Sequence, residues 1–187
     1  MPASHPRVGV VVLLALGLAI GGCGSAEVPA KPMAPQGVDP VAWVDAFCGG
    51  LGEVMAAEAT AAKPESTSQD QKDQLLTLAD ATQQALTDTA HKLSQLGPPA
   101  ITDGKQSQDS AIGFFTTVAA AVGDRRAQLA ALDVNDPNFE QKANQLTGPD
   151  LGGSATQMQG LTSNKELAPA FGTAPQCQRL ITAPAHR

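Results

Sequence analysis

Tyrosine is absent from the sequence, and aromatic residues of any kind are few: one Trp and five Phe, 3% of 187 residues. Strand-rich sandwich cores and surfaces that stack nucleic-acid bases both depend on more aromatic side chains than this. Basic residues are also scarce, because 12 Lys and Arg stand against 18 Asp and Glu and give a net charge of -6. That sign argues against binding to phosphate backbones, and no basic cluster suggests a nucleic-acid partner.

Histidine is rare as well, and only His91 and His186 follow the first 22 residues. A metal site usually needs three or four converging ligands. His91 falls near the end of a predicted helix, where a positively charged ring interacts favourably with the helix dipole. We interpret it as a solvated or capping residue; the alternative is a haem or metal ligand, together with Met55 or Met158. The sequence therefore predicts no cofactor and no metal.

No catalytic motif is complete. Gly152–Thr156 departs from the nucleophile-elbow pattern G-x-S-x-G at its last position, and no predicted strand precedes it. Cys48–Gly52 is glycine-rich but lies in a helical pattern, which favours close helix packing or a bend over a phosphate-binding loop. Asp133, Asn135 and Asp136 lack the Glu that closes a calcium loop, so capping explains them better. We expect a protein that is not an enzyme.

Long apolar runs are missing too. The longest, Val8–Ile20, has 13 residues, whereas a helix needs roughly 20 to cross the hydrocarbon core of a bilayer. A run of this length after a short polar segment with Arg7 is typical of a secretory signal. Small residues, Gly21 and Gly22, then precede Cys23.

The segment Ile20-Gly21-Gly22-Cys23 resembles the lipobox of bacterial lipoproteins, which has an aliphatic residue, two small residues and a cysteine. The resemblance implies that the thiol of Cys23 carries diacylglycerol and that the chain is cut between Gly22 and Cys23. It places the mature protein on the outer face of the cytoplasmic membrane, anchored by acyl chains. The alternatives are a plain secretory signal with a chance cysteine and an uncleaved anchor.

The rest of the chain divides into a linker and one domain. Pro29, Pro32 and Pro35 are spaced through a segment without apolar periodicity, and such segments favour extended polyproline conformations. We therefore divide the chain into a signal peptide at 1–22, a lipidated Cys with its Pro-rich linker at 23–39, and a helical domain at 40–187.

Helical spacing begins at Asp39-Pro40, which reads as an N-cap followed by a first-turn proline. A second helix keeps apolar residues at alternating steps of four and three from Leu75 to Leu96, and Gly97 supplies its stop. The spacing of Ser68 and Gln71 predicts a capping box at its start.

Further helices follow with less regular patterns. Asp103 with Gln106 opens the third helix. The fourth begins after Asp136-Pro137 and is interrupted by glycines and a proline within 148–153. Ser163 with Glu166 caps a last short helix. Because no run alternates with period two, we predict an all-α protein, an antiparallel four-helix bundle.

Two cysteines remain once Cys23 is assigned to lipid: Cys48 and Cys177. Export permits a disulfide, which would tether the C-terminal segment to the first helix. A bridge closing about 130 residues contributes about 4 to 5 kcal/mol in the chain-entropy model. The alternative is two reduced thiols that act as ligands or nucleophiles.

The mature part also resembles the small helical lipoproteins of actinobacteria, through Trp43, Phe47-Cys48 and Ala174-Pro175-Gln176-Cys177. That resemblance implies a location and a fold, and no particular activity. We expect a non-catalytic interaction module that binds another envelope protein or a cell-wall component. The alternative is a carrier of a small apolar ligand, for which Thr82 and Thr89 could leave a gap between helices.

Overall fold

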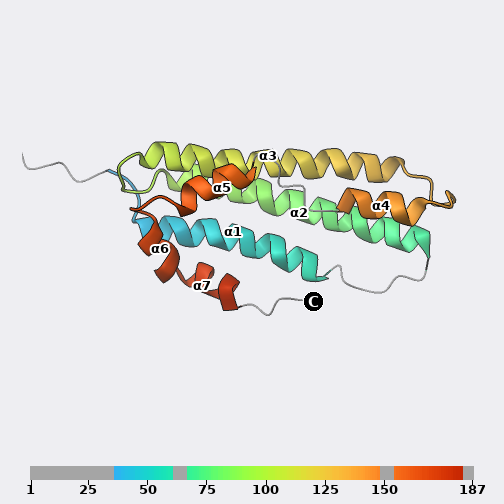
Figure 1. Cartoon of the computed structure of the whole chain (residues 1–187), viewed down its shortest axis with the longest axis horizontal. Coiled ribbons are helices and arrows are strands. Elements are labelled where there is room, and N and C mark those ends of the chain that lie inside the picture. Colours follow the sequence, from blue (N-terminus) through green and yellow to red (C-terminus); the bar gives the residue numbers. More distant parts are fainter. Residues whose placement is uncertain (1–35, 61–66, 148–153, 183–187) are drawn as a thin grey trace, which may run out of the picture. The chain divides into compact units, whose positions relative to one another are not determined.

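Apolar positions repeat at helical spacing after Asp39, and in the computed structural model these segments are helices (Figure 1). The structure describes residues 36–60, 67–147 and 154–182, which all belong to one unit, Ala34–Arg187. The helices in these ranges are α1 (Pro40–Thr60), α2 (Ser68–Leu96), α3 (Gly104–Ala131), α4 (Phe139–Thr147), α5 (Ser154–Thr162), α6 (Ala168–Thr173) and α7 (Pro175–Thr182). No strand occurs among the described residues, although an isolated bridge joins Val38 and Pro99.

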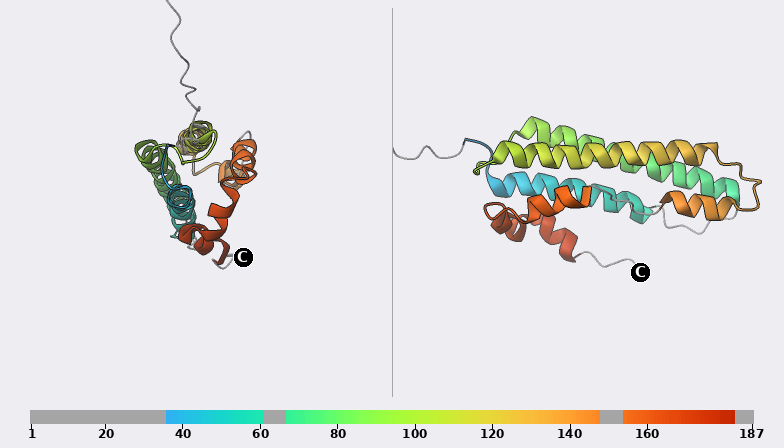
Figure 2. Two further views of the ribbon diagram at one scale, coloured as in Figure 1. Left: turned by 90° about the vertical axis from the view of Figure 1, so that its left-hand side faces the viewer. Right: turned by 45° about the horizontal axis from the view of Figure 1, so that its top comes forward.

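The three long helices form the body of this unit. α2 packs against both α1 and α3, and Figure 1 shows that it runs back along α1 and that α3 runs back along α2. Shorter helices cover this body: α4 contacts α2 and α3, α5 contacts α3, and α6 and α7 contact α1. Figure 2 shows α5 and α6 on the side of α3 and α1 that lies away from α2.

The prediction of a helical protein with a disulfide-tethered C-terminal segment is confirmed, but the described residues form seven helices and not a simple four-helix bundle. One added boundary has a clear cause. α6 and α7 separate at Ala174, which is extended with ψ 124°. Pro175 favours that conformation in the residue before it, and a proline is well suited to the first turn of α7.

Two predicted helix boundaries are confirmed in atomic detail. Oδ1 of Asp39 accepts hydrogen bonds from the backbone N–H groups of Val41 and Ala42, at 2.9 and 3.0 Å. Gly97 ends α2 with φ +86°, a conformation that is strained for residues with a Cβ, and its N–H donates to the carbonyl of Leu93.

Three predicted caps are wrong in detail. α2 is capped by Thr67, whose Oγ1 accepts from the N–H of Asp70, one residue earlier than the predicted Ser68 and Gln71 box. Asp103 precedes α3 in the left-handed region, φ 55°, and its side chain makes no capping hydrogen bond. The predicted box of Ser163 and Glu166 is replaced by Asn164, whose Oδ1 accepts from the N–H groups of Glu166 and Leu167.

Most of the buried apolar residues form one cluster, the major core, which is built from α1, α2, α3 and the helices α5 to α7. Phe47 lies at its centre, since its ring stacks at 6.1 Å on Trp43 and meets Phe114, Phe115 and Phe171 at 5.3 to 6.4 Å. Five of the six aromatic residues of the chain therefore gather at one place.

A second, smaller cluster lies at the other end of α2 and α3. This minor core contains three buried residues, Leu129, Phe139 and Ala143, and five partly buried neighbours pack against it: Leu75, Leu76, Leu132, Val134 and Leu146. Between the two cores, residues 77–85 of α2 and 120–128 of α3 include no buried side chain. The body therefore has two separate apolar centres joined by a more polar stretch.

Candidate functional site

A disulfide joins Cys48 of α1 to Cys177 of α7, with the two α-carbons 5.0 Å apart. Both residues are 4% exposed, so the bridge lies inside the major core. The predicted pairing is confirmed, although the two cysteines are 129 residues apart in the sequence.

One face of α1 is shaped to receive α7. Cys48, Gly49 and Gly52 follow Asp45 by three, four and seven residues, and positions with this spacing share one side of a helix. A Cβ built on Gly49 would be 3.6 Å from Cγ of Gln176, and one built on Gly52 would be 3.6 Å from Cδ2 of Leu180. Both distances are ordinary van der Waals contacts, so Gly49 and Gly52 lie directly under Gln176 and Leu180 of α7.

Asp45 adds a polar contact between the same two helices. Its Oδ1 accepts a hydrogen bond from the backbone N–H of Gln176 at 2.7 Å. Gln176 lies in the first turn of α7, where N–H groups have no partner within the helix and the helix dipole favours a negative charge. α1 therefore supplies α7 with a covalent bond, a cap and a packing surface.

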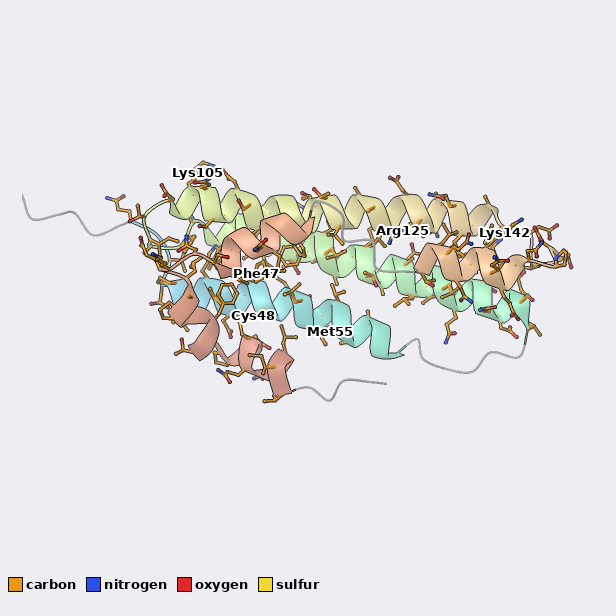
Figure 3. All side chains as sticks on the ribbon, viewed as in Figure 1. Phe47, Cys48, Met55, Lys105, Arg125 and Lys142 are labelled. Carbon is orange, nitrogen blue, oxygen red and sulfur yellow. A yellow bond between two sulfur atoms is a disulfide. The ribbon has the colours of Figure 1, made fainter. Side chains whose placement is uncertain are left out.

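Gly50 lies against the neighbouring helix α2 and not against α7. A Cβ at Gly50 would be 2.1 Å from Cγ2 of Thr89, so only glycine permits this approach. The prediction that Cys48–Gly52 serves close helix packing is confirmed. Figure 3 shows the same division of α1, with Phe47 on the side of α3 and α5 and Cys48 on the side of α7.

Two large apolar side chains are exposed among the described residues: Met55 of α1 at 48% and Ile181 of α7 at 75%. Met55 lies one turn after Gly52, and Ile181 follows Leu180, which packs against Gly52. Met55 and Ile181 thus lie on the two helices that the disulfide joins; the label in Figure 3 marks the place of Met55 on α1. The sequence pattern did not single out these two residues, because they belong to helices far apart in the chain.

The candidate metal and haem ligands lie on several elements. His91 is exposed on α2, Met55 is exposed on α1, and Met158 of α5 packs partly buried against the major core. In the part of the chain that the structure describes, no group of three or more His, Cys, Asp or Glu could hold a metal ion. His186 lies outside that part.

The residues that resemble a calcium loop form a hydrogen-bonded turn ahead of α4. Oδ1 of Asp133 accepts from the N–H of Asn135 at 2.9 Å, and Oδ1 of Asp136 accepts from the N–H of Asn138 at 2.8 Å. The second carboxylate oxygen of Asp136 pairs with Nζ of Lys142 in α4. These bonds lower the pKa of Asp136, first through the Lys142 hydrogen bond. Because α4 begins at Phe139, these carboxylates bond to N–H groups of the turn before the helix, and the predicted helix cap at Asp136 is replaced by that turn.

Trp43 presents a polar atom that sequence reasoning missed. The side chain is fully buried in the major core, and its Nε1 has no hydrogen-bond partner. A buried donor of this kind carries a desolvation cost that most folded proteins avoid. The indole N–H is the one buried side-chain polar atom without a hydrogen-bond partner among the described residues.

Several predictions fall outside the described residues. Cys23, Gly22 and the linker up to residue 35 belong to this group, as does the Gly152-Gly153 start of the Gly-rich segment. No helix in the described ranges is long and apolar enough to cross a membrane. No family model matches the chain, and neither a curated protein nor a solved structure matches it.

Proposed function

We propose that the protein is an exported lipoprotein, anchored through Cys23 to the outer face of the cytoplasmic membrane, that acts as a non-catalytic interaction module of the cell envelope. One observation carries the interaction: Met55 and Ile181 are the two large apolar side chains exposed among the described residues, and they lie on two helices that a disulfide holds together. Exposed apolar side chains on a rigid support are typical of a binding surface. Another envelope protein or a cell-wall component would occupy it.

The same proposal includes the finer architecture. α1, α2 and α3 supply three members of an antiparallel bundle, and α4 with α5 together take the place of the fourth. α6 and α7 are then the tethered C-terminal segment. In this arrangement the Pro-rich linker before Asp39 holds the bundle away from the membrane.

A carrier of a small apolar ligand is the second candidate, and the unpartnered Nε1 of Trp43 favours it. A bound molecule with one hydrogen-bond acceptor would satisfy that atom. The sequence suggested a ligand-binding gap between helices at Thr82 and Thr89. Thr89 is fully buried and packs against Gly50, so no such gap is present at that position. Native mass spectrometry of protein purified from its host decides: a reproducible added mass supports the carrier, and its absence supports the interaction module.

Two experiments test the proposed function. Cys23→Ala is expected to release the protein from membranes or leave an uncleaved precursor; unchanged detergent-phase partitioning and unchanged size would contradict the lipid anchor. A photo-crosslinking residue at Ile181 is expected to yield a discrete adduct in intact cells. The same residue at Thr116, which is exposed on α3, serves as the matched control. Equal labelling from both positions would contradict a binding surface at α1 and α7.

A further inference from the structure

The residues directly before α1 are fastened to the loop that joins α2 to α3. The N–H of Val38 donates to the carbonyl of Pro98 at 2.8 Å, and the N–H of Ala100 donates to the carbonyl of Val38 at 2.7 Å. Gly37 approaches the same loop so closely that a Cβ there would be 2.5 Å from the carbonyl oxygen of Pro98. We call these contacts of Gly37 and Val38 with residues 98–100 the N-terminal clasp. They fix the point from which the preceding chain leaves the helical unit.

The N-terminal clasp marks one end of the helical unit, the clasp end. α1 and α3 begin there, and α2 ends there (Figure 1). The turn before α6 belongs to the same end, because the carboxylate of Glu166 accepts a hydrogen bond from the N–H of Thr102 at 2.9 Å. α2 has 29 residues, which corresponds to a length of about 43 Å. At its other end, the distal end, α3 ends and α4 follows after the turn at Asp133 (Figure 1).

α1 and α7 both run from the clasp end towards the distal end. The first turn of α7 contacts Asp45, and Leu180, one turn later, contacts Gly52. The two helices are therefore parallel. The exposed Met55 and Ile181 follow these contacts in the chain, so both lie beyond them on the way to the distal end. Among the described residues the clasp end exposes no large apolar side chain that could insert into lipid.

The length of chain between Cys23 and the N-terminal clasp limits how far apart the two can lie. Residues 24–36 reach at most about 45 Å even when fully extended, which is close to the length of α2. An acyl chain that holds Cys23 in a bilayer therefore also holds the clasp end near it. Because the bilayer excludes the folded unit, the distal end lies farther out on average.

We infer that the helical unit stands on the membrane with its clasp end towards the bilayer and its distal end away from it. Met55 and Ile181 then lie farther from the lipid than the N-terminal clasp does, and a partner reaches α1 and α7 without competing with lipid. The net charge of -6 also opposes contact of the whole unit with an anionic lipid surface. This inference rests on the proposed lipid anchor and adds the orientation of the anchored protein.

Energy transfer to labelled lipids tests this orientation. A fluorescent donor is attached at Gln106→Cys or at Gln128→Cys of the acylated protein, which is bound to phosphatidylcholine vesicles that contain an acceptor dye on a lipid headgroup. Both glutamines are exposed on α3. They are separated by about six full turns, so they share one side of the helix and differ by about 33 Å along its axis. The donor at position 106 is therefore expected to transfer energy at least about twice as efficiently as the donor at position 128.

Gly37→Ala tests the role of the N-terminal clasp. The added Cβ would collide with the backbone of the loop, and this overpacking is expected to accelerate hydrogen exchange of the Val38 and Ala100 amides about tenfold or more. Release of residues 37–39 lengthens the tether by about 10 Å, so energy transfer from position 106 is expected to decrease. Gly172→Ala is the matched control, since a Cβ there would meet nothing within 4 Å.

Each failure has a distinct result. Equal transfer from positions 106 and 128, or greater transfer from 128, overturns the orientation and leaves the lipid anchor standing. Unchanged exchange at Val38 and Ala100 in Gly37→Ala overturns the N-terminal clasp as the point of exit. Protein that carries no acyl chain in an intact-mass measurement overturns the lipid anchor, and the inference with it.

Discussion

Gly50 of α1 lies directly against Thr89 of α2, so that a Cβ at position 50 would be 2.1 Å from Cγ2 and 2.3 Å from Oγ1 of Thr89. Thr89 is fully buried, and its hydroxyl already donates to the carbonyl of Ala85 at 2.7 Å. The side chain therefore has no free space into which it could turn. The contact fixes the distance between the first two helices of the body.

Gly50→Ala is accordingly expected to destabilise the protein, although alanine favours the helix more than glycine does. Overpacking of this kind costs about 1 to 3 kcal/mol, which lowers the melting temperature by about 2 to 4 °C for each kcal/mol in a domain of this size. Thermal unfolding followed by circular dichroism measures the change.

Gly160→Ala is the matched control, since Gly160 also lies in a helix but a Cβ there would meet nothing within 4 Å. That variant is expected to be neutral or slightly stabilising. In the double variant Gly50→Ala with Thr89→Ala, the loss is expected to be smaller than the sum of the two single losses. Strict additivity would contradict the contact.

The disulfide is expected to be the main attachment of α7. Cys177 is the one buried residue of that helix, so burial alone holds α7 weakly. Removal of the bridge by Cys48→Ser or Cys177→Ser is expected to cost about 3 kcal/mol, and therefore to lower the melting temperature by about 10 °C. The single and double serine variants are expected to behave alike. A shift within experimental error, or two free thiols by peptide mapping without reductant, would contradict this prediction.

Local signals made the helices and the disulfide predictable. Asp39 and Gly97 act on backbone groups a few residues away, so their effect can be read directly from the sequence. The pairing of Cys48 with Cys177 followed once Cys23 was assigned elsewhere, because only two cysteines remained. The helical spacing of apolar residues within 40–96 likewise predicted the first two helices.

Contacts between distant segments could not be predicted in the same way. Asp45 caps a helix 131 residues later, and nothing beside it in the sequence indicates that partner. Glu166 was assigned to a local capping box, yet its carboxylate accepts from the N–H of Thr102, 64 residues away. Asp103 was expected to cap α3 with its side chain, but it lies in the left-handed region and its side chain makes no capping hydrogen bond. For Asp45 and Glu166, a contact with a distant segment of the chain determines the hydrogen-bond partner, and the local sequence does not contain that information.

Asp45→Ala is expected to loosen α7 while the rest of the major core stays folded. Loss of a helix cap costs about 1 kcal/mol, and the disulfide still keeps Cys177 beside α1. Hydrogen exchange is expected to accelerate in residues 175–182 and to remain unchanged in α3. Asp45→Asn keeps an acceptor for the N–H of Gln176 and is the matched control. Equal acceleration in both variants would mean that charge, and not the hydrogen bond, holds the end of α7.

The ion pair of Asp80 and Arg126 predicts a pH dependence of stability. Hydrogen bonds from the guanidinium of Arg126, and then its positive charge, lower the pKa of Asp80, while partial desolvation opposes them. A carboxyl whose pKa is lower in the folded state stabilises the protein fully above its unfolded pKa, about 3.9 for Asp. This contribution is lost as the pH falls through the lower, folded value. Both side chains are substantially exposed, 54% for Asp80 and 40% for Arg126, so the effect is expected to be small and to shrink in high salt.

A double-mutant cycle isolates this contribution. Asp80→Asn, Arg126→Gln and the double variant are compared with wild type by urea unfolding at pH 7 and again at a pH well below the folded pKa of Asp80. At pH 7 the two substitutions are expected to be non-additive, because each one alone breaks the same pair of hydrogen bonds. At the low pH the protonated Asp80 no longer attracts the guanidinium as an anion, so the coupling is expected to fall towards zero. A coupling energy that stays constant between the two pH values would show that Arg126 stabilises α2 and α3 by packing along its apolar stem.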